Sequence, residues 1–132
     1  MFDHNIFILH KTQIEPSLEI ARSAYQVALD FKALQPIVLD LSKLSSLCSY
    51  MVIMSCHQKV QARIIATEIE KALSEKGHEP LRREGGKGSG WILLDYHDVF
   101  INVMHQPERD FYQLEEVWRK AKEIVFEDLP LV

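Results

Sequence analysis

Apolar residues recur at helical spacing in the first part of the chain. Between Thr12 and Phe31 they stand three or four positions apart at Ile14, Leu18, Ala21, Tyr25 and Ala28, and Leu29 follows directly. This spacing predicts a helix that buries one face. Pro16 suits its first turn, where a missing backbone N–H costs little.

Two short apolar runs follow this helix. Pro36–Leu41 and Tyr50–Cys56 are nearly continuous in apolar residues and rich in β-branched ones. Such runs predict strands that are covered on both faces. The serine-rich segment Ser42–Ser46 between them is predicted to be a loop.

A second helix is predicted from His57 to Lys76. Its apolar face consists of Val60, Ile64, Ile65, Ile69, Ala72 and Leu73. Charged residues occupy the other face, at Lys59, Arg63, Glu68, Glu70 and Lys71. Gly77 follows the last turn and suits a left-handed cap.

The second half of the chain predicts three strands and a last helix. Leu81–Glu84 is a short edge strand, Gly85–Gly90 a flexible connection, and residues 91–103 a hairpin. A helix is expected over Pro107–Val125, with Phe111, Leu114, Trp118, Ala121 and Val125 on its core side. The expected order is α-β-β-α-β-β-β-α, an α/β (α+β) fold in which helices pack on a single mixed sheet.

The hairpin pattern separates a core face from a second face. If Tyr96-His97 is a two-residue turn, Asp95 faces Asp98, and the pairs Leu93/Phe100 and Trp91/Asn102 follow. The core side then carries only aliphatic residues, namely Ile92, Leu94, Val99, Ile101 and Val103. The other side mixes large apolar groups with acids, which makes a poor core.

The second face of the hairpin suggests a binding platform. Trp91, Leu93 and Phe100 are predicted to be exposed anchors, with Asp95 and Asp98 at the edge to select a basic partner. Two acids directly across a strand pair are mildly destabilising, which favours a binding role for them. The alternative is that both are ordinary turn residues at a solvated hairpin end. Tyr112 and Glu115 fall off the core stripe of the last helix and extend the same face.

Length and composition narrow the class of protein. The 132 residues fit one domain, 1–132, and 47% hydrophobic with 26% charged residues is typical of a globular protein. A formal charge of −4 argues against a protein that coats DNA. The first ten residues lack the basic region of a signal peptide, and no apolar stretch is long enough to span a bilayer, so we expect a cytoplasmic protein without membrane contact.

Candidate catalytic chemistry is sparse. Asp40, Asp95 and Asp98 could converge on a divalent metal, as in a nucleotidyltransferase or nuclease. Phosphate-loop, zinc-protease and serine-hydrolase motifs are absent from the sequence, and the six histidines are scattered. Cys48 and Cys56 have no zinc spacing and are expected to be free, buried thiols. We therefore expect no cofactor and no catalysis.

A small cluster of basic residues accompanies the edge strand. Arg82, Arg83 and Lys87 could touch phosphate. Charged residues are also the common way to protect an edge strand from further pairing, so both interpretations stay open.

Three segments, in this order, carry a family resemblance. VLDLSKLSSLCSYMVIMSC, GWILLDYHDVFINVM and PERDFYQLEEVW resemble the ribosomal silencing factor family, also called iojap-like proteins, over about residues 28–118. Leu39-Asp40, Gln61, Trp91 and Trp118 stand where that family has the same residues. Departures from the family pattern are Ser49 for an acid, Cys56 for a glycine, Val60 for an arginine, His97 for a turn glycine and Asn102 for a histidine.

The resemblance implies a translation repressor. Such a protein binds ribosomal protein L-fourteen on the large ribosomal subunit and blocks joining of the small subunit when nutrients are scarce, while organelle relatives assist large-subunit assembly. The implied fold is similar to a nucleotidyltransferase core without its catalytic motif. Two alternatives stay open, namely the metal-dependent enzyme that uses Asp40, Asp95 and Asp98, and a module whose exposed face forms a weak homodimer.

Overall fold

Seven strands form one mixed sheet in the computed structural model, which describes residues 6–9 and 15–131. The strands are β1 (Ile6–Leu9), β2 (Leu34–Asp40), β3 (Tyr50–Cys56), β4 (Arg82–Glu84), β5 (Trp91–Asp95), β6 (Val99–His105) and β7 (Lys122–Phe126). The helices are α1 (Pro16–Asp30), α2 (Lys59–Glu75), α3 (Gln106–Tyr112) and α4 (Leu114–Val117). The strand order is β1-β7-β2-β3-β6-β5-β4.

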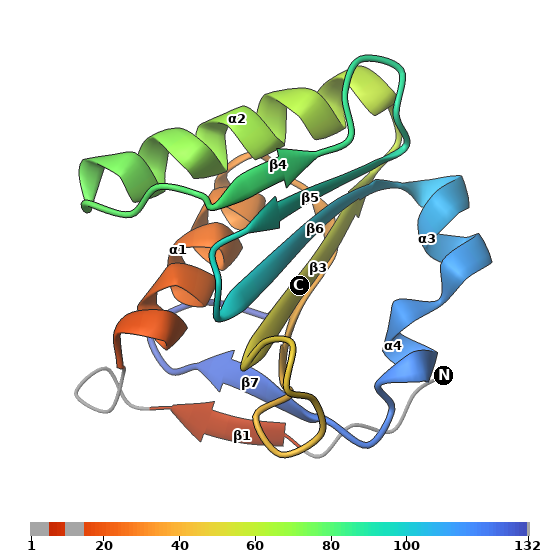
Figure 1. Ribbon diagram of the computed structural model, residues 1–132. Coiled ribbons are helices and arrows are strands. Elements are labelled where there is room, and N and C mark those ends of the chain that lie inside the picture. The colour runs from red at the N-terminus through yellow and green to blue at the C-terminus, as the bar shows by residue number, and fades with distance from the viewer. Residues whose placement is uncertain (1–5, 10–14, 132) are drawn as a thin grey trace.

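The helices lie on both faces of the sheet. Figure 1 shows α1 and α2 together on one face and α3 with α4 on the other. The pairs β1/β7 and β3/β6 are parallel and the remaining pairs are antiparallel, so the sheet is mixed as expected. No helix within residues 6–9 and 15–131 is long and apolar enough to cross a membrane.

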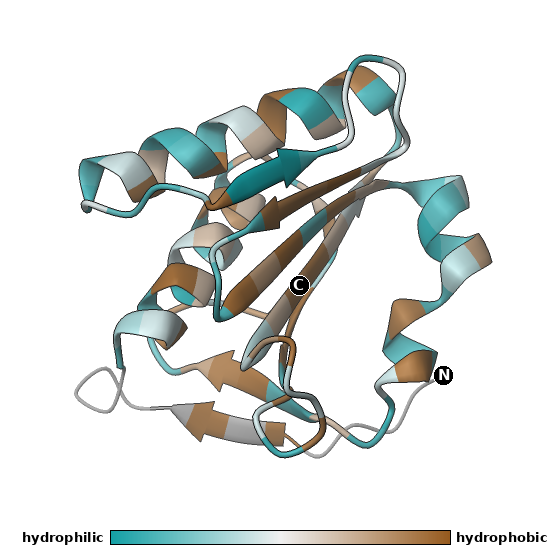
Figure 2. Cartoon of the chain, viewed as in Figure 1, coloured by the Kyte–Doolittle hydropathy of each residue, from teal (hydrophilic) through white to brown (hydrophobic). Residues whose placement is uncertain are grey.

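The main core lies between the sheet and the pair α1/α2. The five aliphatic residues predicted for the core side of the hairpin are completely buried there, beside Val52 and Met54 of β3. Helix α1 contributes its predicted stripe, including Leu18, Ala21 and Tyr25. Figure 2 shows the central strands as largely hydrophobic and β4 as hydrophilic. The predicted start of the first helix at Thr12 and Ile14 falls outside the described residues.

Helix α2 lies where a helix was predicted, but its buried face differs from the prediction at one edge. The buried stripe is Ala62, Ile65, Ala66, Ile69 and Leu73. Val60 and Ile64 were expected in it but are 51% and 50% exposed. Apolar spacing alone does not decide where the buried stripe ends, because Ile64 and Ile65 are adjacent and both are apolar. The helix ends in a Schellman motif, with His78 N–H donating to Leu73 O at 2.9 Å and Gly77 at φ +87°.

The hairpin register differs from the predicted one by two residues. Asp95 faces Phe100 instead of Asp98, and Trp91 faces Met104. The reason is the turn, which is His97-Asp98: Tyr96 N–H donates to Val99 O, and Asp98 N–H donates to Tyr96 O, both at 2.9 Å. His97 takes φ +74°, a left-handed conformation that glycine adopts more easily. A shift of two residues keeps every side chain on its face, so the predicted faces hold.

The end of the chain contains a strand where a continuous helix was predicted. Gln113, at φ +48°, separates α3 from α4, and Lys122–Phe126 forms β7 between β1 and β2. Ile124 and Phe126 alternate into the main core, which a helix would not allow. Phe111, predicted to be core, is 79% exposed because it lies in a helix that ends one residue later. Strand β1 was not predicted.

Candidate partner-binding face

The second face of the sheet has its own apolar cluster, which the chain covers only in part. Its buried members are Leu39, Leu41, Cys48, Met51, Ile53, Met104 and Ala121. Trp91, Phe100, Leu114 and Trp118 pack against this cluster and remain half-buried. The result is an apolar floor with a partly exposed aromatic margin between β5 and the α3–α4 segment.

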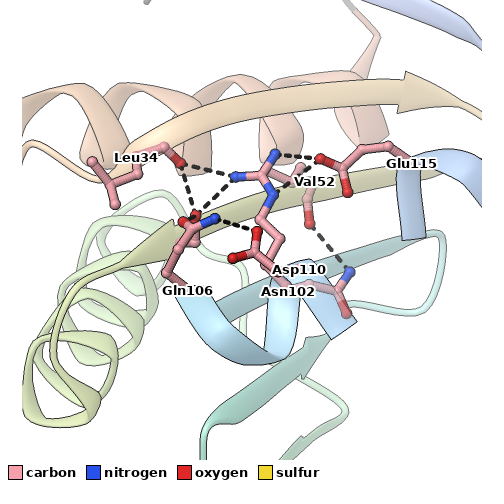
Figure 3. A network of polar contacts seen from close by, with 8 residues as sticks. Leu34, Val52, Asn102, Gln106, Asp110 and Glu115 are labelled. Carbon is pink, nitrogen blue, oxygen red and sulfur yellow. Dashed lines mark hydrogen bonds and ion pairs between the residues drawn. The ribbon is translucent and has the colours of Figure 1, made fainter. Parts of the chain in front are cut away.

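Trp91 is held in a defined orientation at this margin. Its indole Nε1–H donates to Asn102 Oδ1 at 2.9 Å, and Asn102 Nδ2 donates to Val52 O at 3.2 Å. Figure 3 includes the second of these bonds. Because Asn102 is only 2% exposed, the pair is shielded from competing water. An asparagine supplies both the acceptor and the donor, so one side chain links the indole to the backbone of β3.

Helix α3 adds two aromatic side chains to Trp91. The rings of Trp91 and Tyr112 have centroids 4.9 Å apart, and those of Tyr112 and Phe111 are 5.0 Å apart. Tyr112 is 48% exposed and Phe111 is 79% exposed. We call Trp91, Tyr112 and Phe111 the aromatic row. Such exposed, mutually supported rings are the kind of group that dominates binding at protein interfaces.

A buried arginine fastens α3 and α4 to the sheet (Figure 3). Arg109 is 5% exposed and donates to Leu34 O and to Ser55 Oγ, both at 3.0 Å. Its Nε and Nη2 donate to Glu115 Oε2 at 3.0 and 2.8 Å. Ser55 Oγ donates in turn to Gln106 Oε1 at 2.6 Å. The network therefore fixes α3, which carries Phe111 and Tyr112 of the aromatic row, together with α4.

Three of the predicted anchors lie on this face, and two of the predicted acids are not exposed. Trp91, Leu93 and Phe100 are half-buried at the margin. Asp95, expected to be exposed, is 4% exposed, because its Oδ2 lies 3.3 Å from Arg82 Nε and its Oδ1 accepts from His97 N–H at 2.8 Å. The Glu115 side chain is 13% exposed and bound by Arg109.

Asp98 is exposed but is directed toward the opposite layer. Its Oδ2 accepts a hydrogen bond from Ser17 Oγ of α1 at 3.2 Å. Helices α3 and α4 have acids of their own that were not predicted for the binding face, namely Glu108, Asp110 and Glu116. Their repetition with exposed aromatics in PERDFYQLEE was the available signal.

The carboxylates proposed for a metal are engaged separately. Asp40 Oδ1 accepts from Ser42 N–H at 2.9 Å and from Ser42 Oγ at 2.6 Å, whereas Asp95 pairs with Arg82. Within the described ranges, no three His, Cys, Asp or Glu side chains come together in a way that could hold a metal ion. Cys48 and Cys56 are free and buried, and burial raises the pKa of each thiol to about 11.

Comparison with known proteins agrees with the resemblance. The family model described as "Ribosomal silencing factor during starvation" matches residues 14–131. The chain belongs to the ribosomal silencing factor family.

Several relatives are similar to this ribosomal silencing factor family member over most of its length. The ribosomal silencing factor of Halalkalibacterium halodurans is 32% identical over 109 residues, which cover 83% of this chain and 93% of that one. The one from Chromobacterium violaceum is 33% identical over 104 residues, covering 79% and 85%. The chloroplastic protein Iojap of Arabidopsis thaliana is 32% identical over 114 residues, covering 85% of this chain and 48% of that protein.

Solved structures share the fold. A crystal structure of a Chromobacterium violaceum protein superposes with a TM-score of 0.76 at 32% identity, covering 83% of this chain and 90% of that one. A Bacillus halodurans protein gives a TM-score of 0.70 at 31% identity, covering 81% and 97%. The predicted α+β class with one mixed sheet is thus confirmed.

Proposed function

We propose that this ribosomal silencing factor family member binds the large ribosomal subunit through ribosomal protein L-fourteen. In this proposal the bound protein occupies the surface that the small subunit needs, so joining is blocked and translation is repressed. The observation that carries the proposal is the aromatic row, which stays exposed at the margin of a partly covered apolar cluster. Monomeric proteins seldom expose such groups without a partner.

The charge around the aromatic row supports a basic partner. Glu108, Asp110 and Glu116 belong to α3 and α4, and ribosomal proteins are generally basic. Complementary charge accelerates association and selects against acidic surfaces. A stable interface requires about 800 Å² on each partner, which a sheet margin and two helices can supply.

The proposal assigns different roles to the candidate residues. Trp91, Leu93, Phe100 and Tyr112 contact the partner, and Phe111 joins them because of its exposure. Asp95 and Glu115 hold the binding face in place in this proposal. Asp95 fixes the end of the hairpin through Arg82, and Glu115 fixes α3 and α4 through Arg109. Asp98 lies at the outer border, beside α1.

The mechanism in this proposal requires no turnover. A protein that sits at the subunit interface excludes the small subunit sterically, and the degree of repression follows its occupancy. The affinity for the large subunit therefore sets the effect, and substitutions in the aromatic row should act through the dissociation rate.

The test is a sucrose gradient in which purified large subunits meet the protein before small subunits are added. We expect co-migration with the large subunit and loss of joined ribosomes. Phe111→Ala and Tyr112→Ala should each weaken binding by more than about 1 kcal/mol, roughly fivefold, because each removes a central aromatic contact. Phe31→Ala is the matched control, since Phe31 is an exposed aromatic residue at the end of α1.

Three results would contradict the proposal. One is a parent protein that neither co-migrates nor blocks joining. Another is binding that Phe111→Ala and Tyr112→Ala leave at the parent level. A third is co-migration without any block of joining, which would favour the alternative role in large-subunit assembly. Sedimentation at several concentrations checks whether the aromatic row pairs with a second copy of the chain instead.

A further inference from the structure

A second charged surface lies at the beginning of α2. Lys59 and Arg63 are one helical turn apart and therefore share a side of the helix. Lys87 lies in the exposed connection between β4 and β5. Although the chain has 19 acids against 15 lysines and arginines, none of these acids occurs from His57 to Thr67 or from Gly85 to Trp91. We call Lys59, Arg63 and Lys87 the basic corner.

His105 joins the two segments of the basic corner. Its backbone N–H donates to Gly90 O at 2.8 Å, and its ring Nε2 lies 3.0 Å from His57 O. The end of the connection and the start of α2 therefore meet at one residue. Figure 1 shows the chain after β4 passing beside the first turns of α2. Glu108, an acid beside this junction, has its Oε1 3.1 Å from His105 Nδ1.

The charges of the basic corner are not neutralised within the described residues. Arg82, predicted from the sequence to share a patch with Lys87, pairs with Glu84 at 2.9 Å, and Arg83 pairs with Glu70. These two arginines are thus occupied at the edge strand. Lys59, Arg63 and Lys87 have no ion-pair partner in the part of the chain that the structure describes.

The basic corner also has an apolar component and a position that suit a large ligand. Val60 and Ile64 are half-exposed in the same turns of α2, where a macromolecule would cover them. His105 immediately precedes α3, which carries Tyr112 and Phe111 of the aromatic row. The basic corner and the aromatic row therefore flank the same end of the sheet, and one extended partner can reach both.

We propose that the basic corner binds the phosphate backbone of ribosomal RNA beside the protein docking site. This proposal rests on the proposed function, in which the partner is a particle of RNA and basic protein. A cationic patch on a chain of net charge −4 would be repelled by basic ribosomal proteins and attracted by the phosphates between them. Because phosphate contacts carry no sequence information, the corner would set the orientation of the bound protein without reading bases.

The experiment measures binding as a function of salt. The test variant combines Lys59→Gln, Arg63→Gln and Lys87→Gln. The control combines Lys32→Gln, Lys43→Gln and Lys71→Gln, which removes the same charge from exposed positions elsewhere. Dissociation constants are determined for purified large subunits at several salt concentrations, and in parallel for isolated ribosomal protein L-fourteen.

The test variant should bind large subunits about tenfold more weakly at low salt. Its salt slope should be smaller than that of the parent by about two to three, since each lost phosphate contact removes roughly 0.7 to 0.9 from the slope. Binding to isolated L-fourteen should be unchanged, and the control variant should keep the parental slope. Val60→Arg, which adds a cation within the corner, should increase the slope by about one.

Two results would overturn the proposal. A test variant with the parental salt slope on large subunits would mean that the corner contacts no phosphate. An equal loss of binding to isolated L-fourteen would place the corner in a protein interface instead. Failure of the proposed function gives a different result. In that case the parent protein does not bind isolated L-fourteen, whereas the basic corner is tested by the salt slope for binding to whole large subunits.

Discussion

Removing the Arg109 side chain tests whether the buried network holds the partner-binding face in place. In Arg109→Met, Glu115 loses both charge-assisted hydrogen bonds, and Leu34 O and Ser55 Oγ lose a donor. The side chains of Arg109 and Glu115 are 5% and 13% exposed, so solvent can replace little of what is lost. The substitution therefore leaves a mostly buried carboxylate without its cation.

The expected cost follows from that uncompensated charge. Removing one partner of a buried ion pair typically costs about 3–5 kcal/mol. We expect the lower end, about 3 kcal/mol, because Glu115 keeps some contact with solvent. The double variant Arg109→Met with Glu115→Leu removes both charges and should be more stable than Arg109→Met alone by about 1–2 kcal/mol.

Urea unfolding followed by circular dichroism measures both free energies. A loss of about 3 kcal/mol corresponds to a decrease of roughly 1–2 M in the urea midpoint for a domain of this size. The exposed pair Arg119–Glu116, at 3.0 Å, offers a control, and Arg119→Met should cost less than about 1 kcal/mol. If Arg109→Met cost no more than that control, or if the double variant were less stable than the single one, the reasoning would be refuted.

Three further predictions concern the loops and the core. Gly85→Ala should destabilise the protein more than Gly88→Ala: both residues have positive φ, but a Cβ at Gly85 would lie 2.3 Å from a backbone carbonyl oxygen of β5, whereas Gly88 has nothing within 4 Å. Equal urea midpoints for the two variants would contradict this. Cys48 and Cys56, each with a pKa raised by burial from 9.0 to about 11, should react slowly with a thiol reagent at pH 8 until the protein unfolds. Fast labelling of the native protein would argue against buried thiols. Because the thiols ionise at lower pH in the unfolded protein, the free energy of unfolding should fall as pH rises from about 9 to 11. Tyr96→Phe should leave stability unchanged or raise it by up to about 1 kcal/mol, because the buried hydroxyl has no hydrogen-bond partner among the described residues, and a clear loss of stability would reveal one.

The functional candidates were only partly visible in the sequence. Trp91 and Phe100 could be placed on the non-core face because strand alternation is a local property. The exposure of Phe111 could not be predicted, because it depends on the helix ending at Tyr112 and on the left-handed residue Gln113. The burial of Asp95 could not be predicted either, since its cation comes from a neighbouring strand.

By itself, the sequence determined the buried strands at Pro36–Leu41 and Tyr50–Cys56, the face of each hairpin strand that enters the core, and the family that the ordered motifs resemble. These properties depend on periodicity and residue identity within short stretches, and a register error of two residues leaves them intact. Tertiary structure decided the rest. Lys122–Phe126 becomes a strand because it fills the sheet between β1 and β2, whereas its local pattern continued a helix. Arg109 holds α3 on the sheet because its Nη1 lies 3.0 Å from Leu34 O, although the two residues are 75 positions apart in sequence. Such contacts arise only when distant segments meet, and no local pattern records them.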